Sequence, residues 1–206
     1  AELAKGNLTL LRALLAGWTR GPALTALLDA RIEGENQYTL LAWAAWHGQA
    51  DAVRLLLESG ASVGATTGRG STALAIACQE GQLECVRLLL GANADADQAK
   101  DTGATPLFMA CQKGQLECVR LLLEAGAAVN QAKDGGVTPL LIACYQGHLA
   151  IMLSLLRAGA DTAARTPDGR TALQLAKEKG HTECERAFEA AAREAKRAEI
   201  EAKVER

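Results

Sequence analysis

The sequence predicts an all-α solenoid of stacked helix–turn–helix units, because two ladders of residues share one period. Threonines recur every 33 residues, at Thr39, Thr72, Thr105, Thr138 and Thr171. Glycines recur at the same spacing, at Gly48, Gly81, Gly114, Gly147 and Gly180. Each ladder pair frames apolar segments with helical spacing, such as "TPLFMACQKG" and "QLECVRLLLEAG". A unit this small cannot bury its apolar side alone, so its stability must come from stacking on its neighbours.

Within each unit, the ladder threonine is expected to be the N-cap of the first helix. Pro106 and Pro139 mark two helix starts, because proline at the first helical position loses no intrahelical hydrogen bond. The second helix is expected to end near Gly60, Gly126 or Gly159, where a left-handed residue can terminate it. A polar connector such as "NQAKDGGV" then leads to the next unit.

The N-terminal part, residues 1–33, is predicted to be a partial capping repeat with an insertion. Gly6 takes the place of a turn glycine, but it precedes Gly48 by 42 residues, nine more than the period. The extra residues lie near 17–31, where Pro22 predicts a short additional helix at about 23–28. This segment either caps the first core layer or lengthens the first connector so that it contacts a partner.

Four complete repeats follow at 34–66, 67–99, 100–132 and 133–165, and a C-terminal capping repeat follows at 166–190. Residues 191–206 are predicted to be a charged helical extension, because the end of the chain contains no Gly or Pro. The Glu189–Arg193 and Glu199–Lys203 pairs have the favourable i, i+4 order. We interpret the extension as a cap with a solvated end. A coiled-coil partner is the alternative.

Two segments match the pattern G-x-T-P-L…A…G-H-L…V…L-L…G-A-D, namely "DTGATPLFMACQKGQLECVRLLLEAGAAVN" and "DGGVTPLLIACYQGHLAIMLSLLRAGAD". Over about residues 33–190 the chain therefore resembles the ankyrin repeat family. The resemblance implies a curved stack of helix pairs, connectors that project as β-hairpin-like fingers, and a concave face built from fingers and first helices. The histidine usual after T-P-L is absent, and Gln37 replaces the expected finger glycine, so the first finger is expected to be irregular.

Charge and motifs argue against several classes of function. With 22 basic and 24 acidic residues the net charge is −2, so we expect no nucleic-acid partner. No apolar run reaches the roughly 18–20 residues that span a bilayer, so no membrane insertion is expected. We find no catalytic constellation, phosphate-binding loop or metal-ligand spacing, which predicts no enzyme, cofactor or metal. His148 and His181, directly after turn glycines, are interpreted as structural.

The six cysteines occupy only two positions of the repeat. Cys78, Cys111 and Cys144 lie six residues after the threonine, and Cys85, Cys118 and Cys184 lie four after the glycine. Equivalent helices of adjacent repeats are roughly 8–10 Å apart, whereas a disulfide needs Cα atoms about 4.4–6.8 Å apart. We therefore expect buried packing residues in a reducing, cytoplasmic location.

Binding residues are expected on the concave face, where side chains vary while the framework stays constant. Most lie just before the ladder threonine or the turn glycine. The predicted set is Tyr38, Trp46, His47, Arg69, Gln79, Glu80, Phe108, Gln112, Lys113, Val137, Tyr145, Gln146 and Arg170. Tyr and Trp are the strongest candidates, because such residues often contribute ~2 kcal/mol or more to an interface. Phe108 could equally pack between repeats, and Trp43 is assigned to the core.

The partner implied by the resemblance is a protein or peptide, bound by a monomeric domain. We expect its apolar anchor near Tyr38 and Trp46, with basic residues facing the acidic side chains at that end. Those side chains are Glu33, Glu35, Glu80, Asp101 and Asp134. Two alternatives stay open: a structural spacer joined or dimerised through the C-terminal helix, and a regulatory segment of a larger enzyme or channel.

Overall fold

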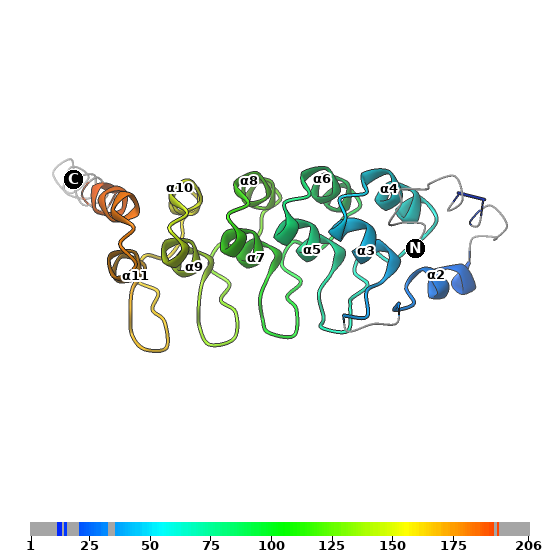
Figure 1. Ribbon diagram of the computed structural model, residues 1–206, viewed down its shortest axis with the longest axis horizontal. Coiled ribbons are helices and arrows are strands. Elements are labelled where there is room, and N and C mark those ends of the chain that lie inside the picture. Colours follow the sequence, from blue (N-terminus) through cyan, green and yellow to red (C-terminus); the bar gives the residue numbers. More distant parts are fainter. Residues whose placement is uncertain (1–11, 14, 16–20, 33–35, 192, 194–206) are drawn as a thin grey trace, which may run out of the picture.

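Pairs of short helices stand side by side in a row in the computed structural model, which describes residues 12–13, 15, 21–32, 36–191 and 193 (Figure 1). The first helices of the pairs are α3 (Leu40–Trp46), α5 (Ala73–Glu80), α7 (Pro106–Lys113), α9 (Pro139–Gln146) and α11 (Ala172–Glu178). The second helices are α4 (Ala50–Glu58), α6 (Leu83–Gly91), α8 (Leu116–Glu124) and α10 (Leu149–Arg157). Residues 182–191 and 193 are also helical and follow α11. The predicted solenoid of helix pairs is confirmed.

Each first helix begins directly after its ladder threonine, as predicted. The five threonine side chains accept a hydrogen bond from the backbone N–H three residues later, at 3.1–3.4 Å. Pro106 and Pro139 occupy the first helical position. These caps satisfy backbone donors that the helix cannot satisfy itself.

The second helices end before a residue in the left-handed conformation. Gly60, Gly126 and Gly159 have φ angles of 96°, 84° and 83°. Asn93 stands at the same repeat position with φ 60°. Asparagine can replace glycine here because its short polar side chain tolerates left-handed backbone.

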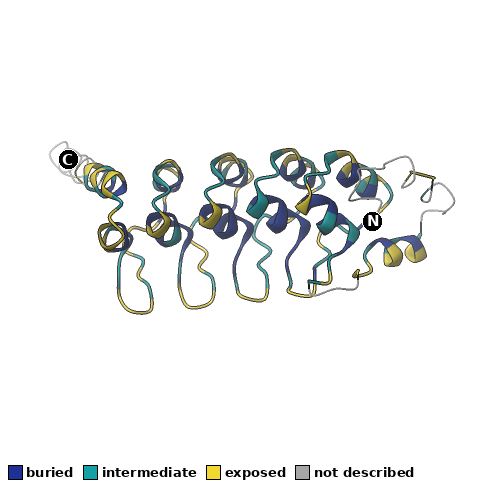
Figure 2. Cartoon of the chain, in the orientation of Figure 1, coloured by how far each residue is buried: buried dark blue, intermediate teal, exposed yellow. Residues whose placement is uncertain are grey.

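The core lies between the two layers of helices (Figure 2). Leucines with the 33-residue period fill it, namely Leu41, Leu74, Leu107 and Leu140 from the first helices and Leu56, Leu89, Leu122 and Leu155 from the second. One cluster of buried side chains runs from Leu24 to Phe188. Stacking of neighbours therefore buries the apolar sides that a single unit would expose.

The connectors project as hairpin-like fingers on one side of the row (Figure 1). The second to fifth fingers close between residues 67 and 71, 100 and 104, 133 and 137, and 166 and 170, with N···O distances of 2.9–3.1 Å. The first finger closes differently, from Ile32 N–H to the Tyr38 carbonyl at 2.7 Å. Gln37 adopts φ 46°, where the other fingers have glycine. The predicted irregularity of this finger is confirmed.

The additional N-terminal helix is α2 (Pro22–Leu28), with Pro22 in its first turn. Leu24 and Leu28 are buried in the main cluster. The Thr25 hydroxyl donates to the Gly60 carbonyl at 3.2 Å, and Asp29 Oδ1 accepts from the Ser62 N–H at 2.9 Å. These contacts attach α2 to the first complete repeat and favour the capping interpretation of residues 17–31.

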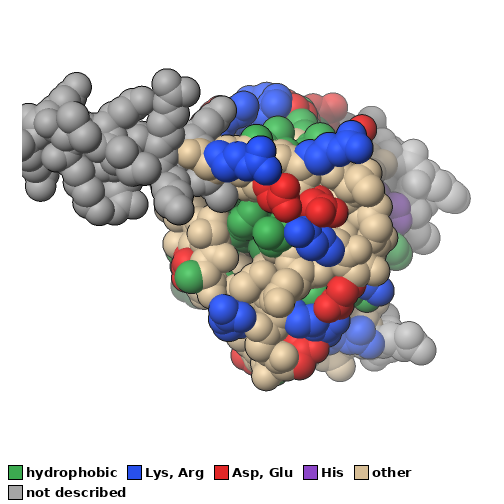
Figure 3. Space-filling view, turned by 90° about the vertical axis from the view of Figure 1, so that its left-hand side faces the viewer, with side chains coloured by type: hydrophobic (Ala, Val, Ile, Leu, Met, Phe, Trp, Pro, Cys, Tyr) green, Lys and Arg blue, Asp and Glu red, His purple; other side chains and the backbone are tan. Residues whose placement is uncertain are grey.

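At the C-terminal end, Lys177 of α11 contacts Glu185 at 3.3 Å and Glu189 at 3.1 Å. The predicted Glu189–Arg193 pair is present at 3.7 Å, whereas Glu199–Lys203 and most of the 191–206 extension lie outside the described residues. Lys, Arg, Asp and Glu side chains are interspersed around a small hydrophobic group on this end (Figure 3). None of the described helices is long and apolar enough to cross a membrane.

Candidate functional site

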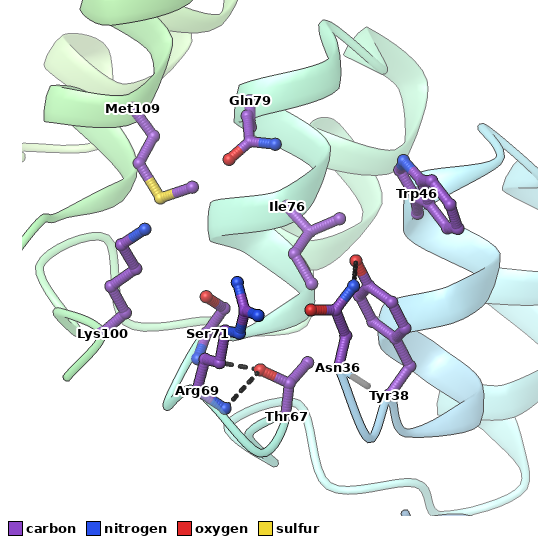
Figure 4. A pocket seen from close by; sticks show the side chains of 10 residues that line it. All are labelled: Asn36, Tyr38, Trp46, Thr67, Arg69, Ser71, Ile76, Gln79, Lys100 and Met109. Carbon is purple, nitrogen blue, oxygen red and sulfur yellow. Dashed lines mark hydrogen bonds between the residues drawn. The ribbon is translucent and has the colours of Figure 1, made fainter. Parts of the chain in front are cut away.

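Two hollows lie on the finger face, which we define as the surface formed by the fingers and the first helices. The first hollow has a volume of about 200 Å³ and is lined by Asn36, Tyr38, Trp46, Thr67, Arg69, Ser71, Ile76, Gln79, Lys100 and Met109 (Figure 4). The second hollow has a volume of about 230 Å³ and is lined by Phe108, Gln112, Lys133, Val137, Leu141, Ile142, Tyr145, Thr166, Arg170 and Leu175. Each draws side chains from three consecutive repeats.

In the first hollow, two aromatic side chains stack on each other. Tyr38 directly precedes the N-cap of α3, and Trp46 ends that helix. Their rings lie 5.4 Å apart with an interplanar angle of 11°, and the Tyr38 hydroxyl accepts from Asn36 Nδ2 at 3.3 Å. Trp46 remains 40% exposed. A partner would therefore meet an ordered aromatic surface.

The charged side chains that line the first hollow are Arg69 and Lys100 (Figure 4). This differs from the acidic surroundings predicted around Tyr38 and Trp46. The Glu80 carboxylate accepts a hydrogen bond from Gln79 at 2.7 Å. The Asp101 carboxylate lies against the turn of the preceding finger, where a Cβ on Gly70 would meet it at 2.1 Å. Glu33 and Glu35 lie outside the described residues.

His47 and Trp43 occupy positions that the sequence did not predict correctly. Trp43 is half-buried rather than in the core, and its ring stacks on His47 at 3.7 Å. His47 Nδ1 is also 2.9 Å from the Trp43 carbonyl oxygen. The aromatic group next to Trp46 therefore includes a histidine that is already held by its own helix.

In the second hollow, the walls are apolar. Phe108 is 2% exposed and packs with Ala75, Ala104 and Met109. It thus packs between repeats and also lines the hollow, which resolves the two interpretations of this residue. Val137 and Ile142 are half-buried. Together with the buried Leu175 they form a depression that a side chain from outside can enter.

Cations and an exposed aromatic ring form the rim of the second hollow. Tyr145 is 38% exposed, and the Lys179 ammonium lies 4.5 Å from its ring centroid. The Lys133 ammonium lies 5.7 Å from the Phe108 centroid. Both distances are within the range in which a cation is attracted to the face of an aromatic ring.

Arg170 is held in place by two carboxylates on the same rim. Its Nη1 lies 2.6 Å from Glu178, and its Nη2 pairs with Asp168. Hydrogen bonds from Thr166 and then Arg170 lower the pKa of Asp168. Because these carboxylates offset the charge of Arg170, the guanidinium acts as a fixed wall of the hollow rather than as an unpaired cation.

The hollows bring together nine of the thirteen predicted binding residues. Tyr38, Trp46, Arg69 and Gln79 line the first, and Phe108, Gln112, Val137, Tyr145 and Arg170 line the second. His47, Glu80, Lys113 and Gln146 line neither. Lys100 and Lys133 were missed by sequence reasoning, although they share one finger position 33 residues apart at which Thr67 and Thr166 also stand.

All six cysteines are buried, and none forms a disulfide. Burial, and then a hydrogen bond to Cys118, raise the pKa of Cys78. Burial, and then the proximity of Cys184, raise the pKa of Cys144 to about 12. This diagonal contact between consecutive repeats was not predicted, although its 40-residue offset is visible in the sequence.

His148 and His181 are structural, as predicted. The His181 ring nitrogen Nε2 lies 3.0 Å from the Tyr145 carbonyl oxygen. A Cβ placed on Gly147 would lie 2.5 Å from the His181 ring, and one on Gly114 would lie 2.8 Å from the His148 ring. The turn glycines are therefore needed both for their left-handed φ angles and for the close approach of the next repeat.

A family model described as ankyrin repeats (3 copies) matches residues 41–133, 74–166 and 131–193. The chain belongs to the ankyrin repeat family. No curated protein matches the chain. Ankyrin repeats are generally protein–protein interaction modules. Within the described residues, no three His, Cys, Asp or Glu side chains gather as a possible metal site.

Proposed function

We propose that this ankyrin domain is a non-enzymatic module that binds a protein or peptide on its finger face. The observation that carries the proposal is the position of two exposed aromatic residues. Trp46 and Tyr145 occupy the same repeat position, three repeats apart, and each stands beside one of the two hollows. Glutamines, Gln79 and Gln112, take this position in the intervening repeats.

The repeat framework supports this function physically. Capped helices and a continuous leucine core hold the fingers and first helices, while the exposed side chains on them differ from repeat to repeat. Aromatic side chains bury a large area at a small cost in side-chain entropy, which is why they dominate many interfaces. The 5.4 Å stack of Tyr38 on Trp46 orders both rings before binding.

We place one apolar anchor of the partner against Tyr38 and Trp46 in the first hollow. The remaining predicted residues would contribute contacts around the two hollows, with His47, Glu80, Lys113 and Gln146 at their margins. The domain would act as a monomer and would not bind nucleic acid, because its net charge is −2. Six buried thiols favour a reducing, cytoplasmic location.

Selection of short linear peptides from a display library on the intact chain tests this function. The selected peptides are then measured against a Tyr38→Ala, Trp46→Ala, Tyr145→Ala variant whose circular dichroism matches that of the intact chain. We expect the variant to lose binding. The matched control carries Arg54→Ala, Arg87→Ala and Arg157→Ala on the exposed surface of the second helices, and it should bind normally. Equal binding by all three proteins would contradict the assignment to the finger face.

A further inference from the structure

We propose that the second hollow binds an acidic linear peptide, which inserts one apolar side chain between Phe108 and Ile142 and places carboxylates against Lys133 and Lys179. This inference rests on the peptide-binding function proposed above and adds the site and the chemistry of the peptide. Size, charge and finger geometry each support it.

The size of the hollow fits one side chain. Pockets that bury a whole small molecule usually measure about 300–1,000 Å³, whereas this hollow measures about 230 Å³. Its apolar walls include Phe108, Ile142 and Leu175. Because the hollow offers few polar partners in its depth, the group that enters must itself be apolar, as a leucine or phenylalanine side chain is.

The charges at the rim favour an acidic peptide. Lys133 and Lys179 form no ion pair with any carboxylate within the described part of the chain. Asp168 and Glu178 are turned to the Arg170 guanidinium. These five side chains sum to a net charge of +1, and both unpaired charges are positive.

The acidic neighbour of Lys133 is also turned away from the hollow. A Cβ on Gly103 would lie 2.6 Å from the Asp134 carboxylate, which places that carboxylate against the turn of the third finger. Peptide carboxylates at this rim would therefore meet two unpaired ammonium groups, each already held over an aromatic ring. Electrostatic complementarity of this kind favours acidic over basic partners.

The fingers on the two sides of the second hollow lack a link that joins the others. Backbone hydrogen bonds connect the first four fingers in turn, from Gly68 to Asn36 at 3.1 Å, from Asp101 to Arg69 at 3.3 Å and from Asp134 to Thr102 at 3.1 Å. Pro167 stands at the equivalent position of the fifth finger and has no N–H to donate.

The missing link lies where the second hollow needs room. Lys133 and Val137 come from the fourth finger, and Thr166 and Arg170 come from the fifth. These two fingers can separate to admit a side chain without breaking a backbone hydrogen bond of this series. In the first hollow, the same separation would break the Gly68–Asn36 or Asp101–Arg69 bond.

The test uses a library of short linear peptides with a fixed central leucine and flanking positions drawn equally from Asp, Lys and Ser. Panning on the intact chain should enrich Asp at the flanks. Enriched peptides should bind more weakly as NaCl is added, because salt screens charges at an exposed rim. Enrichment of Lys or Ser, or no enrichment, overturns the proposal.

Charge-reversal variants locate the peptide. Lys133→Glu and Lys179→Glu should each weaken binding by about fivefold, the size expected for an exposed ion pair. Lys100→Glu and Lys113→Glu make the same changes at the same repeat positions in earlier repeats, and they should leave the affinity unchanged. None of these four side chains is buried, so all four variants should fold.

The two proposals fail in different ways. Peptides that lose affinity with Trp46→Ala or Lys100→Glu, but not with Lys133→Glu or Lys179→Glu, would move the site to the first hollow. That result overturns this inference and leaves the proposed function intact. Peptides whose affinity depends only on Arg54, Arg87 and Arg157 would overturn both.

Discussion

The two hollows occupy corresponding repeat positions and differ in chemistry. Tyr38 in the first corresponds to Val137 in the second, and Trp46 corresponds to Tyr145. The first hollow is lined by polar and cationic side chains beside a Tyr–Trp stack, whereas the second has apolar walls and cations at its rim. The comparison teaches that one backbone framework supports two different binding surfaces through changes at a few periodic positions.

The framework shared by both hollows should be sensitive to cavities. Leu107 is fully buried in α7, and the residues around it contribute to both hollows. Leu107→Ala should lower the free energy of unfolding by about 2–5 kcal/mol, because the stack cannot collapse around the missing atoms. Urea denaturation measures this. A change below ~1 kcal/mol would contradict a framework that is rigid between the hollows.

The same framework should weaken at high pH. Burial, and then the nearby Glu84, raise the pKa of the Cys85 thiol from its ordinary value of 9.0 to about 11. The folded state therefore holds this proton longer than the unfolded state, so the contribution is fully present below pH 9 and is lost as the pH rises to 11. The slope is up to about 1.4 kcal/mol per pH unit. Cys85→Ala should reduce the slope seen in denaturation curves measured across this range.

Much of the framework could be predicted from the sequence, because its signals are local and periodic. The threonine caps, α2 after Pro22 and the irregular finger at Gln37 all follow from single residues whose backbone requirements are known. The positions of both leucine rows and both structural histidines follow from the period.

The chemistry of the hollows was harder to predict, because it depends on contacts between repeats. The acidic surroundings expected near Tyr38 are absent from the hollow itself, since Glu80 is bonded to Gln79 and Asp101 lies against Gly70. Trp43 is half-buried because it stacks on His47. No single position of the period reports such pairings.

The exposed aromatic residues should separate the two hollows functionally. Tyr145→Ala should weaken a peptide bound at the second hollow by roughly 30-fold, as for an interface residue worth about 2 kcal/mol. Trp46→Ala should leave that peptide's affinity unchanged. Titration calorimetry with a peptide selected on the intact chain measures both. Equal losses in the two variants would mean that one peptide spans both hollows.

The fingers should differ in how easily they separate. Pro167→Ala restores an N–H at the position where Gly68, Asp101 and Asp134 link their fingers to the preceding ones. A hydrogen bond worth about 1 kcal/mol would hold the fourth and fifth fingers together and weaken peptide binding by up to about fivefold. The amide at position 167 should then exchange slowly with solvent deuterons. Fast exchange together with unchanged binding would remove the proposed role of the proline.

The central claim is that the finger face binds the partner, and hydrogen–deuterium exchange of the intact chain with and without a selected peptide tests it most directly. We predict that protection will concentrate in the fourth and fifth fingers and in the first helices α7, α9 and α11. Protection confined to the second helices α4, α6, α8 and α10, with the fingers unchanged, would contradict the account.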